Sequence, residues 1–416
     1  MPLRRAAAIV QTDILVLNVG VLVLWMFNMR IFVPTEFDPS ERRVPVVPST
    51  VSRLVKLGAP IEIETGLGRS INFSDADYEA AGASVLKDRQ AGLGSAEMIL
   101  RLHGPPLAEI PTLKRDCIHV SHLDPFNKPD LVQALASAGV NAICMEMIPR
   151  STIAQKMDAL SSQASLAGYV AVLLGADRLD RAFPMMMTPA GTIPPAKIFI
   201  IGVGVAGLQA IATAKRLGAV VEAFDTRPVV EEQVKSLGAK FVKADLGQTG
   251  QTEGGYAKEL TPAQLEKQRE VMAQRCAQAD IVITAAQVFG RRAPVIVTTA
   301  MVEKMKAGAV IVDLAAENGG NVECSRLNEE VIVHGVRVLG PRNLAGHVPR
   351  TASEMYSNNL GNLIEHFWDR ETKTFRLDPQ GDILTDCLLT HGGAIRNEKI
   401  RQLADARIAA EAGATA

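Results

Sequence analysis

Short apolar runs alternate with helical patterns along the chain from residue 29 onward. The first series of runs reads RIFVPT, PIEIET, AEMILRL, CIHVSHL and NAICMEM, and stretches with helical periodicity separate its members. Short apolar runs bounded by turn residues are typical of buried strands. Their alternation with helices predicts an α/β fold in which parallel sheets carry helices on both faces.

A second series of the same kind follows. Its runs are KIFIIG, AVVEAF, AKFVKA, DIVITA, AVIVDL and VRVLG. Each run is again followed by a helical or turn-rich stretch, so this half also predicts a parallel sheet. We therefore expect two Rossmann-like domains.

Two long helical stretches connect the series. One begins behind Pro149 and meets no proline before Pro184, which gives a helix long enough to join two domains. The other, SEMYSNNLGNLIEHFWD, follows Pro341 and is expected to return to the first domain, which is then discontinuous. The expected boundaries are 29–165 with 345–400 for the first domain, 166–344 for the second, and 401–416 for a flexible tail.

Residues 1–28 differ from the rest of the chain. After Arg4 and Arg5, an apolar stretch from Ile14 to Phe27 has about the length of a signal-peptide core and is shorter than a span of ~20 residues. No A-x-A-like cleavage site follows it. We expect translation to start at Met29, so that this segment is a mis-called extension. A native membrane anchor is the alternative, and N-terminal mass spectrometry of the natural protein distinguishes the two.

The first strand of the second series runs into a glycine-rich turn. Gly202 permits a tight turn, Gly204 lets the backbone approach a pyrophosphate, and Gly207 lets the following helix pack against the strand. The pyrophosphate would lie near Val205 at the helix N-terminus, where unpaired N–H groups and the macrodipole stabilise negative charge. The alternative is a glycine turn that serves packing alone.

Asp225 ends the next apolar run of this series. A carboxylate at this position accepts hydrogen bonds from both adenosine ribose hydroxyls and repels a 2′-phosphate. The sequence therefore predicts a site for NAD(H) rather than NADP(H), which also includes the neighbouring Thr226. Arg227 follows directly, and its positive charge weakens the inference slightly.

Composition and charge exclude several classes of protein. The formal charge of −1 and the pI near 6.7 give no general attraction to nucleic acid, so we expect no nucleic-acid partner. The five cysteines are scattered without C-x-x-C spacing, which fits buried, reduced thiols. The seven histidines are equally dispersed, and no metal site is predicted.

Three segments resemble the soluble NAD(H)-binding component of proton-translocating nicotinamide nucleotide transhydrogenases. They are MEMIPRSTIAQKMDALSSQASLAGY, AFPMMMTPAGTIPPAKIFIIGVGVAGLQAIATAKRLGA and GGYAKE, and the resemblance runs from Met29 to about Gly393. It implies a homodimer with bound NAD(H), a membrane subunit and an NADP(H)-binding beta subunit as partners. It also implies a cytoplasmic location with peripheral attachment to the inner membrane through those partners.

The resemblance extends to a polar register behind the last strand of the first domain. There the family carries Arg, Gln, Asp and Ser in the positions of Arg150, Gln155, Asp158 and Ser161. It implies that these residues form the hydride-transfer site, and that Gln155 reaches the nucleotide of the partner. A guanidinium, an amide and a carboxylate can surround a nicotinamide, its carboxamide and its ribose. The alternative is a capped helix with a solvated polar face.

The segment DLGQTGQTEGGYAKEL lacks apolar periodicity and predicts a mobile surface loop. The resemblance implies that this loop closes over the bound nucleotide, with Gly255 and Tyr256 covering it and excluding water. The alternative is a long linker. Gln268 and Gln287 are expected at the carboxyl edge of the sheet, where nucleotides bind. The family more often has an apolar residue at the position of Gln287.

The expected reaction is reversible hydride transfer between NAD(H) here and NADP(H) on a partner, coupled to proton translocation by membrane partners. The chain has no run of ~20 apolar residues after Met29, so we expect the partners to move the protons. Transfer between two nicotinamides needs placement and exclusion of water but no general acid or base.

The transhydrogenase family also resembles alanine dehydrogenase, which is the alternative enzyme. That reaction needs a cation for the substrate carboxylate and a proton-transfer group. Alanine dehydrogenases carry a Lys on the strand where this chain has Arg101, which speaks against that activity. His122 matches their catalytic histidine by position, and we expect it to remain as a polar core residue. A non-catalytic NAD-sensing module is the third hypothesis.

Overall fold

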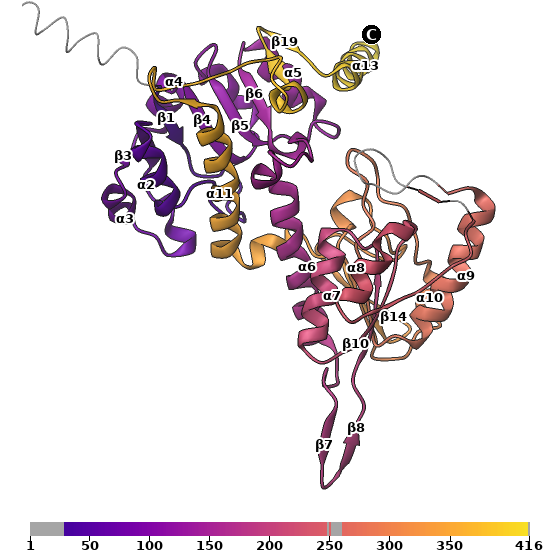
Figure 1. Ribbon diagram of the computed structural model, residues 1–416. Coiled ribbons are helices and arrows are strands. Elements are labelled where there is room, and N and C mark those ends of the chain that lie inside the picture. The colour runs from indigo at the N-terminus through magenta and orange to yellow at the C-terminus, as the bar shows by residue number, and fades with distance from the viewer. Residues whose placement is uncertain (1–28, 248, 251–259, 415–416) are drawn as a thin grey trace, which may run out of the picture. The chain divides into compact units, whose positions relative to one another are not determined.

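The computed structural model describes residues 29–247, 249–250 and 260–414 (Figure 1). The chain forms two compact units. Unit 1 comprises Met1–Ala159 and Ser353–Ala416, and unit 2 comprises Leu160–Ala352. The predicted discontinuity of the first domain therefore has a counterpart here, with crossings at 159/160 and 352/353 where the sequence led us to expect 165/166 and 344/345.

Unit 1 is built on a sheet of six parallel strands in the order β3-β2-β1-β4-β5-β6. The strands are β1 (Ile31–Val33), β2 (Ile61–Glu64), β3 (Ser84–Leu86), β4 (Met98–His103), β5 (Ile118–His122) and β6 (Asn141–Cys144). Strand order reverses between β1 and β4, as in doubly wound folds. Apolar side chains pack on both faces of the sheet, which explains the nearly continuous apolar runs.

Helices cover both faces of this sheet. They are α2 (Pro48–Lys56), α3 (Asp75–Ala80), α4 (Arg89–Ser95), α5 (Pro129–Ser137), α11 (Pro349–Phe367), α12 (Leu384–Cys387) and α13 (Glu398–Ala414). The return of the chain through α11 is fixed by hydrogen bonds, because Val44 N and Val47 N donate to the hydroxyls of Ser353 and Ser357 at 2.8 and 3.0 Å. Helix α11 therefore lies beside the segment that leads into α2 (Figure 1).

The C-terminal segment differs from the expectation of a flexible tail beginning at residue 401. It forms α13, and Ile400 and Ala404 on that helix are only 0% and 1% exposed. These two side chains belong to the same core cluster as Leu131 and Leu135 of α5. Burial of apolar side chains against α5 accounts for the order of this segment.

Unit 2 contains seven strands in the order β11-β10-β9-β12-β13-β15-β14. They are β9 (Lys197–Ile201), β10 (Val220–Phe224), β11 (Lys240–Phe241), β12 (Ile281–Thr284), β13 (Val310–Asp313), β14 (Glu330–Val333) and β15 (Val336–Leu339). All pairs are parallel except β14 with β15, which is antiparallel. The predicted α/β class with two Rossmann-like domains is confirmed.

The helices of unit 2 lie on both faces of its sheet. They are α6 (Ala159–Arg178, whose first residue belongs to unit 1), α7 (Val205–Arg216), α8 (Glu231–Ser236), α9 (Pro262–Gln278) and α10 (Thr299–Val302). Helices α6 and α7 approach closely, since a Cβ on Gly168 would lie 2.0 Å from the carbonyl oxygen of Ala206.

Helix α6 is, among the described residues, the one helix long and apolar enough to cross a membrane by length and composition alone. No such segment was expected from the sequence after Met29. Here the helix contributes Val170, Ala171 and Val172 to the core of unit 2. A core helix of a soluble domain passes the same test, so its composition is explained by this packing.

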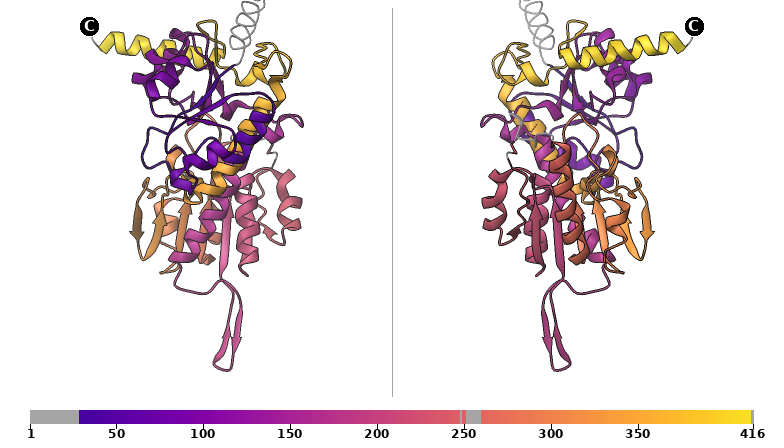
Figure 2. Two further views of the ribbon diagram at one scale, coloured as in Figure 1. Left: turned by 90° about the vertical axis from the view of Figure 1, so that its left-hand side faces the viewer. Right: turned by 90° about the vertical axis from the view of Figure 1, so that its right-hand side faces the viewer.

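A two-stranded arm extends from unit 2 away from its sheet (Figure 2). Its strands β7 (Met186–Thr188) and β8 (Gly191–Ile193) pair only with each other, and every residue in them is exposed. Unit 1 carries two smaller hairpins, β16 (Trp368–Asp369) with β17 (Thr374–Phe375) and β18 (Thr390–His391) with β19 (Ala394–Ile395).

Candidate functional site

The three glycines behind β9 have different structural reasons. Gly202 has φ of +95°, and a Cβ there would lie 2.8 Å from the backbone of Ala285 and Ala286. A Cβ on Gly207 would lie 2.0 Å from the carbonyl oxygen of Gly202. Gly204 has an ordinary φ of −84°, and a Cβ there would have no described atom within 4 Å apart from its chain neighbours. Internal packing therefore accounts for Gly202 and Gly207, and leaves an external group as the reason for Gly204.

Gly204 is also the N-cap of α7, a helix of 12 residues. No described side chain caps this end of the helix, and Val205 at its first position is 41% exposed. Backbone N–H groups at such an end bind anions, and the macrodipole adds to the attraction. The turn thus fits a pyrophosphate that comes close to the main chain of Gly204.

Asp225 lies at the end of the neighbouring strand β10 and faces this turn. Its Oδ2 accepts a hydrogen bond from Val203 N at 2.8 Å, which holds the carboxylate against the glycine turn. Arg227 donates from its backbone N and its Nε to Oδ1, both at 2.9 Å, and from Nη2 to Oδ2 at 2.8 Å. The hydrogen bond with Asp225 raises the pKa of Arg227. The neighbouring Thr226 accepts a hydrogen bond at its carbonyl oxygen from Thr249 Oγ1 at 2.6 Å.

The end of β12 forms the other wall of the turn and is held by amide side chains. Gln287 donates to the carbonyl oxygen of Leu314 at 2.7 Å and accepts from Asn318 at 3.0 Å. Asn321 bonds both the N–H and the carbonyl of Ala286. Asn321 was not identified from the sequence. Its signal was the motif GGN behind the apolar run AVIVDL, a turn that follows a buried strand.

Two predicted components of the site are placed differently or not described. Gln268 is only 6% exposed and shares the buried face of α9 with Met272 and Cys276, because these residues are spaced by one helical turn. Its amide therefore packs toward the interior of unit 2. Gly255 and Tyr256 lie outside the described residues.

The polar register in unit 1 forms a short anchored turn. Gln155 begins the 3₁₀-helix η4 (Gln155–Met157), and Asp158 caps its end. Met157 is fully buried, and the carbonyl oxygen of Lys156 accepts hydrogen bonds from two asparagine side chains of α11 at 2.8 and 3.0 Å. Arg150 and Gln155 are exposed. The structure thus brings Arg150, Gln155 and Asp158 into one segment of unit 1.

Ser161 lies two residues beyond the crossing between the units, in the first turn of α6, and belongs to unit 2. The structure therefore does not place it in the same unit as the other three residues of the register. Its side chain is half-buried.

The residues that bear on amino-acid chemistry are engaged in internal contacts. Arg101 is 1% exposed and donates from Nη1 to Glu109 Oε2 at 2.7 Å. His122 lies with Nδ1 3.5 Å from Glu146 Oε2 and stacks on Tyr356 at a ring distance of 5.2 Å. Burial raises the pKa of Glu146, but the charge of His122 and several hydrogen bonds lower it to about 2. These contacts match the expected role of His122 as a polar core residue.

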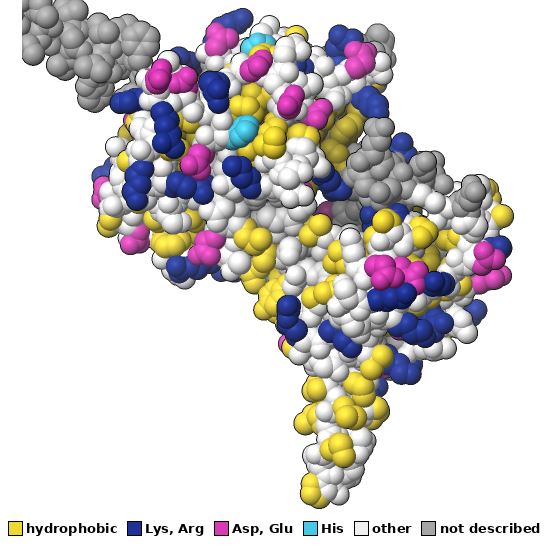
Figure 3. Space-filling view, in the orientation of Figure 1, with side chains coloured by type: hydrophobic (Ala, Val, Ile, Leu, Met, Phe, Trp, Pro, Cys, Tyr) yellow, Lys and Arg dark blue, Asp and Glu magenta, His cyan; other side chains and the backbone are white. Residues whose placement is uncertain are grey.

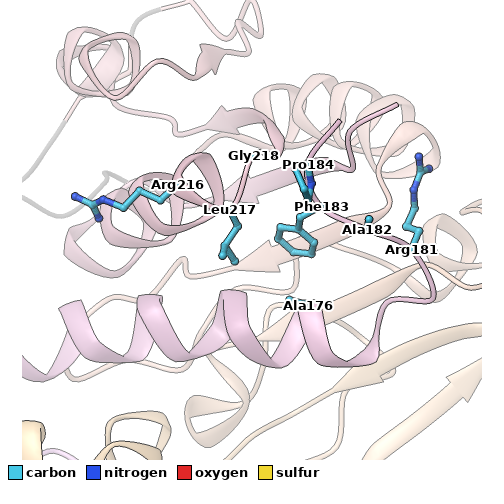
Figure 4. A pocket seen from close by; sticks show the side chains of 8 residues that line it. All are labelled: Ala176, Arg181, Ala182, Phe183, Pro184, Arg216, Leu217 and Gly218. Carbon is cyan, nitrogen blue, oxygen red and sulfur yellow. The ribbon is translucent and has the colours of Figure 1, made fainter. Parts of the chain in front are cut away.

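The largest hollow that we find in unit 2 lies at the opposite edge of its sheet (Figure 4). Its volume is about 630 Å³, and its lining includes Phe183, Leu217 and Gly218, which precede β9 and β10. Leu217 and Phe183 point toward α6, whereas the side chains of Arg181 and Arg216 extend outward on either side (Figure 4). Because nucleotides bind at the carboxyl ends of parallel strands, this hollow is not the dinucleotide site.

Thiols and metal ligands provide no further site. The five cysteines are free, and four of them are buried. Burial raises the pKa of Cys117, Cys276 and Cys387 to about 12, so these thiols stay protonated at neutral pH. Across the described residues of the chain, no group of three or more His, Cys, Asp or Glu side chains could hold a metal ion.

Comparison with known proteins supports this site. Models of the alanine dehydrogenase/PNT N-terminal and C-terminal domains match residues 32–167 and 171–398. The first portion of NAD(P) transhydrogenase subunit alpha from Rhodospirillum rubrum is 42% identical over 374 residues, which cover 88% of this chain and 97% of that protein. The crystal structure of transhydrogenase from Sinorhizobium meliloti is also 42% identical, with a TM-score of 0.79 over 88% of this chain and 99% of that chain.

An alanine dehydrogenase is more distant. Alanine dehydrogenase 2 of Staphylococcus aureus is 30% identical over 338 residues, which cover 79% of this chain and 85% of that protein. The predicted relationship to transhydrogenase alpha subunits, and through them to alanine dehydrogenase, is therefore confirmed, and with it the assignment to an oxidoreductase family. With both domain models matched in order and nearly the whole chain covered, this protein belongs to the alanine dehydrogenase/PNT family.

Proposed function

We propose that this chain is the NAD(H)-binding subunit of a proton-translocating NAD(P) transhydrogenase. It exchanges hydride reversibly between NAD(H), which it binds, and NADP(H), which a beta subunit holds. The main support is the turn at Gly204, whose open side and uncapped helix fit a pyrophosphate beside the carboxylate of Asp225. The relative from Rhodospirillum rubrum carries the name of a transhydrogenase subunit, which agrees with this assignment.

The chain's own residues would hold and orient the coenzyme. The backbone around Gly204 binds the pyrophosphate, Asp225 binds the adenosine ribose, and Thr226 and Arg227 follow that carboxylate along the chain. The nicotinamide supplies the hydride chemistry when it is bound. We further propose that Arg150, Gln155 and Asp158 orient the nicotinamide end, and that Ser161 assists them.

The anchoring of that segment suits a positioning role. Burial of Ala154 and Met157 and the two hydrogen bonds to the carbonyl oxygen of Lys156 fix the backbone of the turn. The exposed amide of Gln155 is then presented from a rigid base. Because a displacement of about 1 Å can cost about a hundredfold in rate, such rigidity favours ring-to-ring transfer.

Alanine dehydrogenase activity has less support in this chain. A substrate carboxylate needs an available cation, but the guanidinium of Arg101 is buried and already paired with Glu109. A proton-transfer group must reach the substrate, but His122 is held between Glu146 and Tyr356. NADH oxidation with pyruvate and ammonium tests this alternative directly, because our proposal expects none until an NADP(H)-binding component is added. Failure of that component to elicit any reaction would favour a nucleotide sensor.

The homodimer and the partners also belong to the proposal. The arm β7–β8 carries exposed apolar side chains, with Met185 59%, Met187 75% and Ile193 45% exposed (Figure 3). No charged residue occurs between Phe183 and Lys197. An isolated hairpin is marginally stable in water, and large apolar surfaces mark association sites. We propose that a second copy of the chain covers this arm, and that membrane and beta subunits attach the dimer peripherally to the inner membrane.

A further inference from the structure

All hydrogen-bonding positions on the carboxylate of Asp225 are already filled within the chain. An ionised carboxylate has about four lone-pair sites. Two backbone N–H groups, from Val203 and Arg227, take one site on each oxygen. The side chain of Arg227 takes the other two, with Nε on Oδ1 at 2.9 Å and Nη2 on Oδ2 at 2.8 Å. A ribose can therefore bind Asp225 only by replacing one of these donors.

The four donors differ in how easily they can be replaced. The backbone groups belong to the glycine turn and to the end of β10, so they cannot leave without unfolding those elements. The guanidinium of Arg227 stands on rotatable bonds and offers two parallel N–H groups in a fork. A vicinal ribose diol also offers two adjacent donors. The side chain of Arg227 thus occupies the sites that the two ribose hydroxyls would take.

We propose that Arg227 is a specificity-determining residue, whose guanidinium yields its place on Asp225 to a ribose diol and is withheld by Asp225 from a 2′-phosphate. This inference rests on the proposed NAD(H) site. A coenzyme with a 2′-phosphate has lost one of the two hydroxyl donors and brings negative charge toward the carboxylate, so it cannot replace the fork. NADP(H) sites commonly use a nearby arginine to hold the 2′-phosphate. Here the arginine is present, and the carboxylate of Asp225 neutralises it.

A second contact keeps Arg227 at the site if Asp225 is removed. Its Nη2 also donates to the carbonyl oxygen of Val203 at 3.0 Å, within the glycine turn. Only 15% of its side chain is exposed, which limits how far it can move. Loss of the carboxylate would therefore release a guanidinium beside the adenosine ribose, where a 2′-phosphate would lie.

Titration of NADH and NADPH against the full chain and its variants tests this assignment. The wild type should bind NADH and bind NADPH weakly. Asp225→Ala should weaken NADH binding and tighten NADPH binding by about tenfold or more, the scale of one charge-assisted hydrogen bond. The double variant Asp225→Ala/Arg227→Ala should lose that gain. As a matched control, Asp225→Ala/Arg216→Ala removes an arginine at the opposite edge of the sheet and should keep the gain.

Two outcomes would overturn the role of Arg227. One is the absence of any gain in NADPH affinity in Asp225→Ala. The other is a gain that persists in the double variant, because relief of repulsion by the carboxylate would then explain it without Arg227. If Asp225→Ala does not fold, Asp225→Asn gives the same comparison with the charge removed and one acceptor kept. If the wild type itself does not bind NADH, the proposed site fails; if only the variant pattern fails, the site stands and Arg227 has no such role.

Discussion

Gly204→Ala should separate coenzyme binding from stability. The added methyl group would meet no described atom within 4 Å, and φ of −84° suits alanine. Alanine restricts the unfolded chain, which stabilises by about 0.4–1 kcal/mol, while it is a poorer N-cap than glycine by about the same amount. These effects offset each other, so the free energy of unfolding should change by less than about 1 kcal/mol.

The same methyl group would occupy the space through which a pyrophosphate approaches the backbone. Loss of one or two charge-assisted hydrogen bonds costs about 1.5–3 kcal/mol each, so NADH affinity should fall at least about tenfold. The matched variant is Gly207→Ala. Its Cβ would lie 2.0 Å from the carbonyl oxygen of Gly202, and overpacking of this kind should cost about 3 kcal/mol or more.

Urea unfolding and fluorescence titration with NADH measure the two effects independently. We expect Gly204→Ala to unfold at the wild-type urea concentration with weakened NADH binding, and Gly207→Ala to unfold much earlier. Wild-type NADH affinity in Gly204→Ala would refute the placement of the pyrophosphate. A large loss of stability in that variant would show that Gly204 serves packing.

Other variants probe the remaining features of the molecule. Asp225→Ala should weaken NADH binding by about 1.5–3 kcal/mol, and an unchanged titration would remove this residue from the site. Gln155→Asn should slow hydride transfer far more than it weakens NADH binding, because it shortens a positioning group; equal losses would contradict that role. Met187→Asp should shift the chain from dimer to monomer in light scattering, and an unchanged mass would place the dimer contact elsewhere. Glu146 has its pKa lowered from 4.5 to about 2, so its stabilising contribution is present above pH 4.5 and is lost as the pH falls toward 2. Urea unfolding should therefore show Glu146→Gln less stable than wild type at pH 7, with the difference shrinking over that range; a constant difference would argue against the ionised carboxylate.

The apolar runs of the sequence predicted most strands because those strands are buried on both faces. The strands that were missed are β3 and β14 at the sheet edges, where no residue is fully buried and apolar periodicity is weak. The arm β7–β8 was missed for the opposite reason, because its apolar residues face solvent. Patterns report burial within one chain, so edges and arms escape them.

The candidate site was predictable where backbone geometry demands a residue type. Gly202, Gly204 and Gly207 fall in a turn whose shape requires glycine or leaves room for a ligand. The pairing of Arg227 with Asp225 was not predictable, because sequence proximity does not show which way a side chain turns. The burial of Gln268 depends on the orientation of α9, which tertiary packing decides.

The central claim is that hydride passes from a nicotinamide held by this chain to one held by a partner, without another reactant. The most direct measurement combines this chain with an NADP(H)-binding transhydrogenase component, NADP⁺ and NADH that carries deuterium on C4 of the nicotinamide. Mass spectrometry of the products should find the label on the nicotinamide of NADPH. NADPH that forms without the label, or no NADPH when both components are folded and have bound their coenzymes, would contradict the claim.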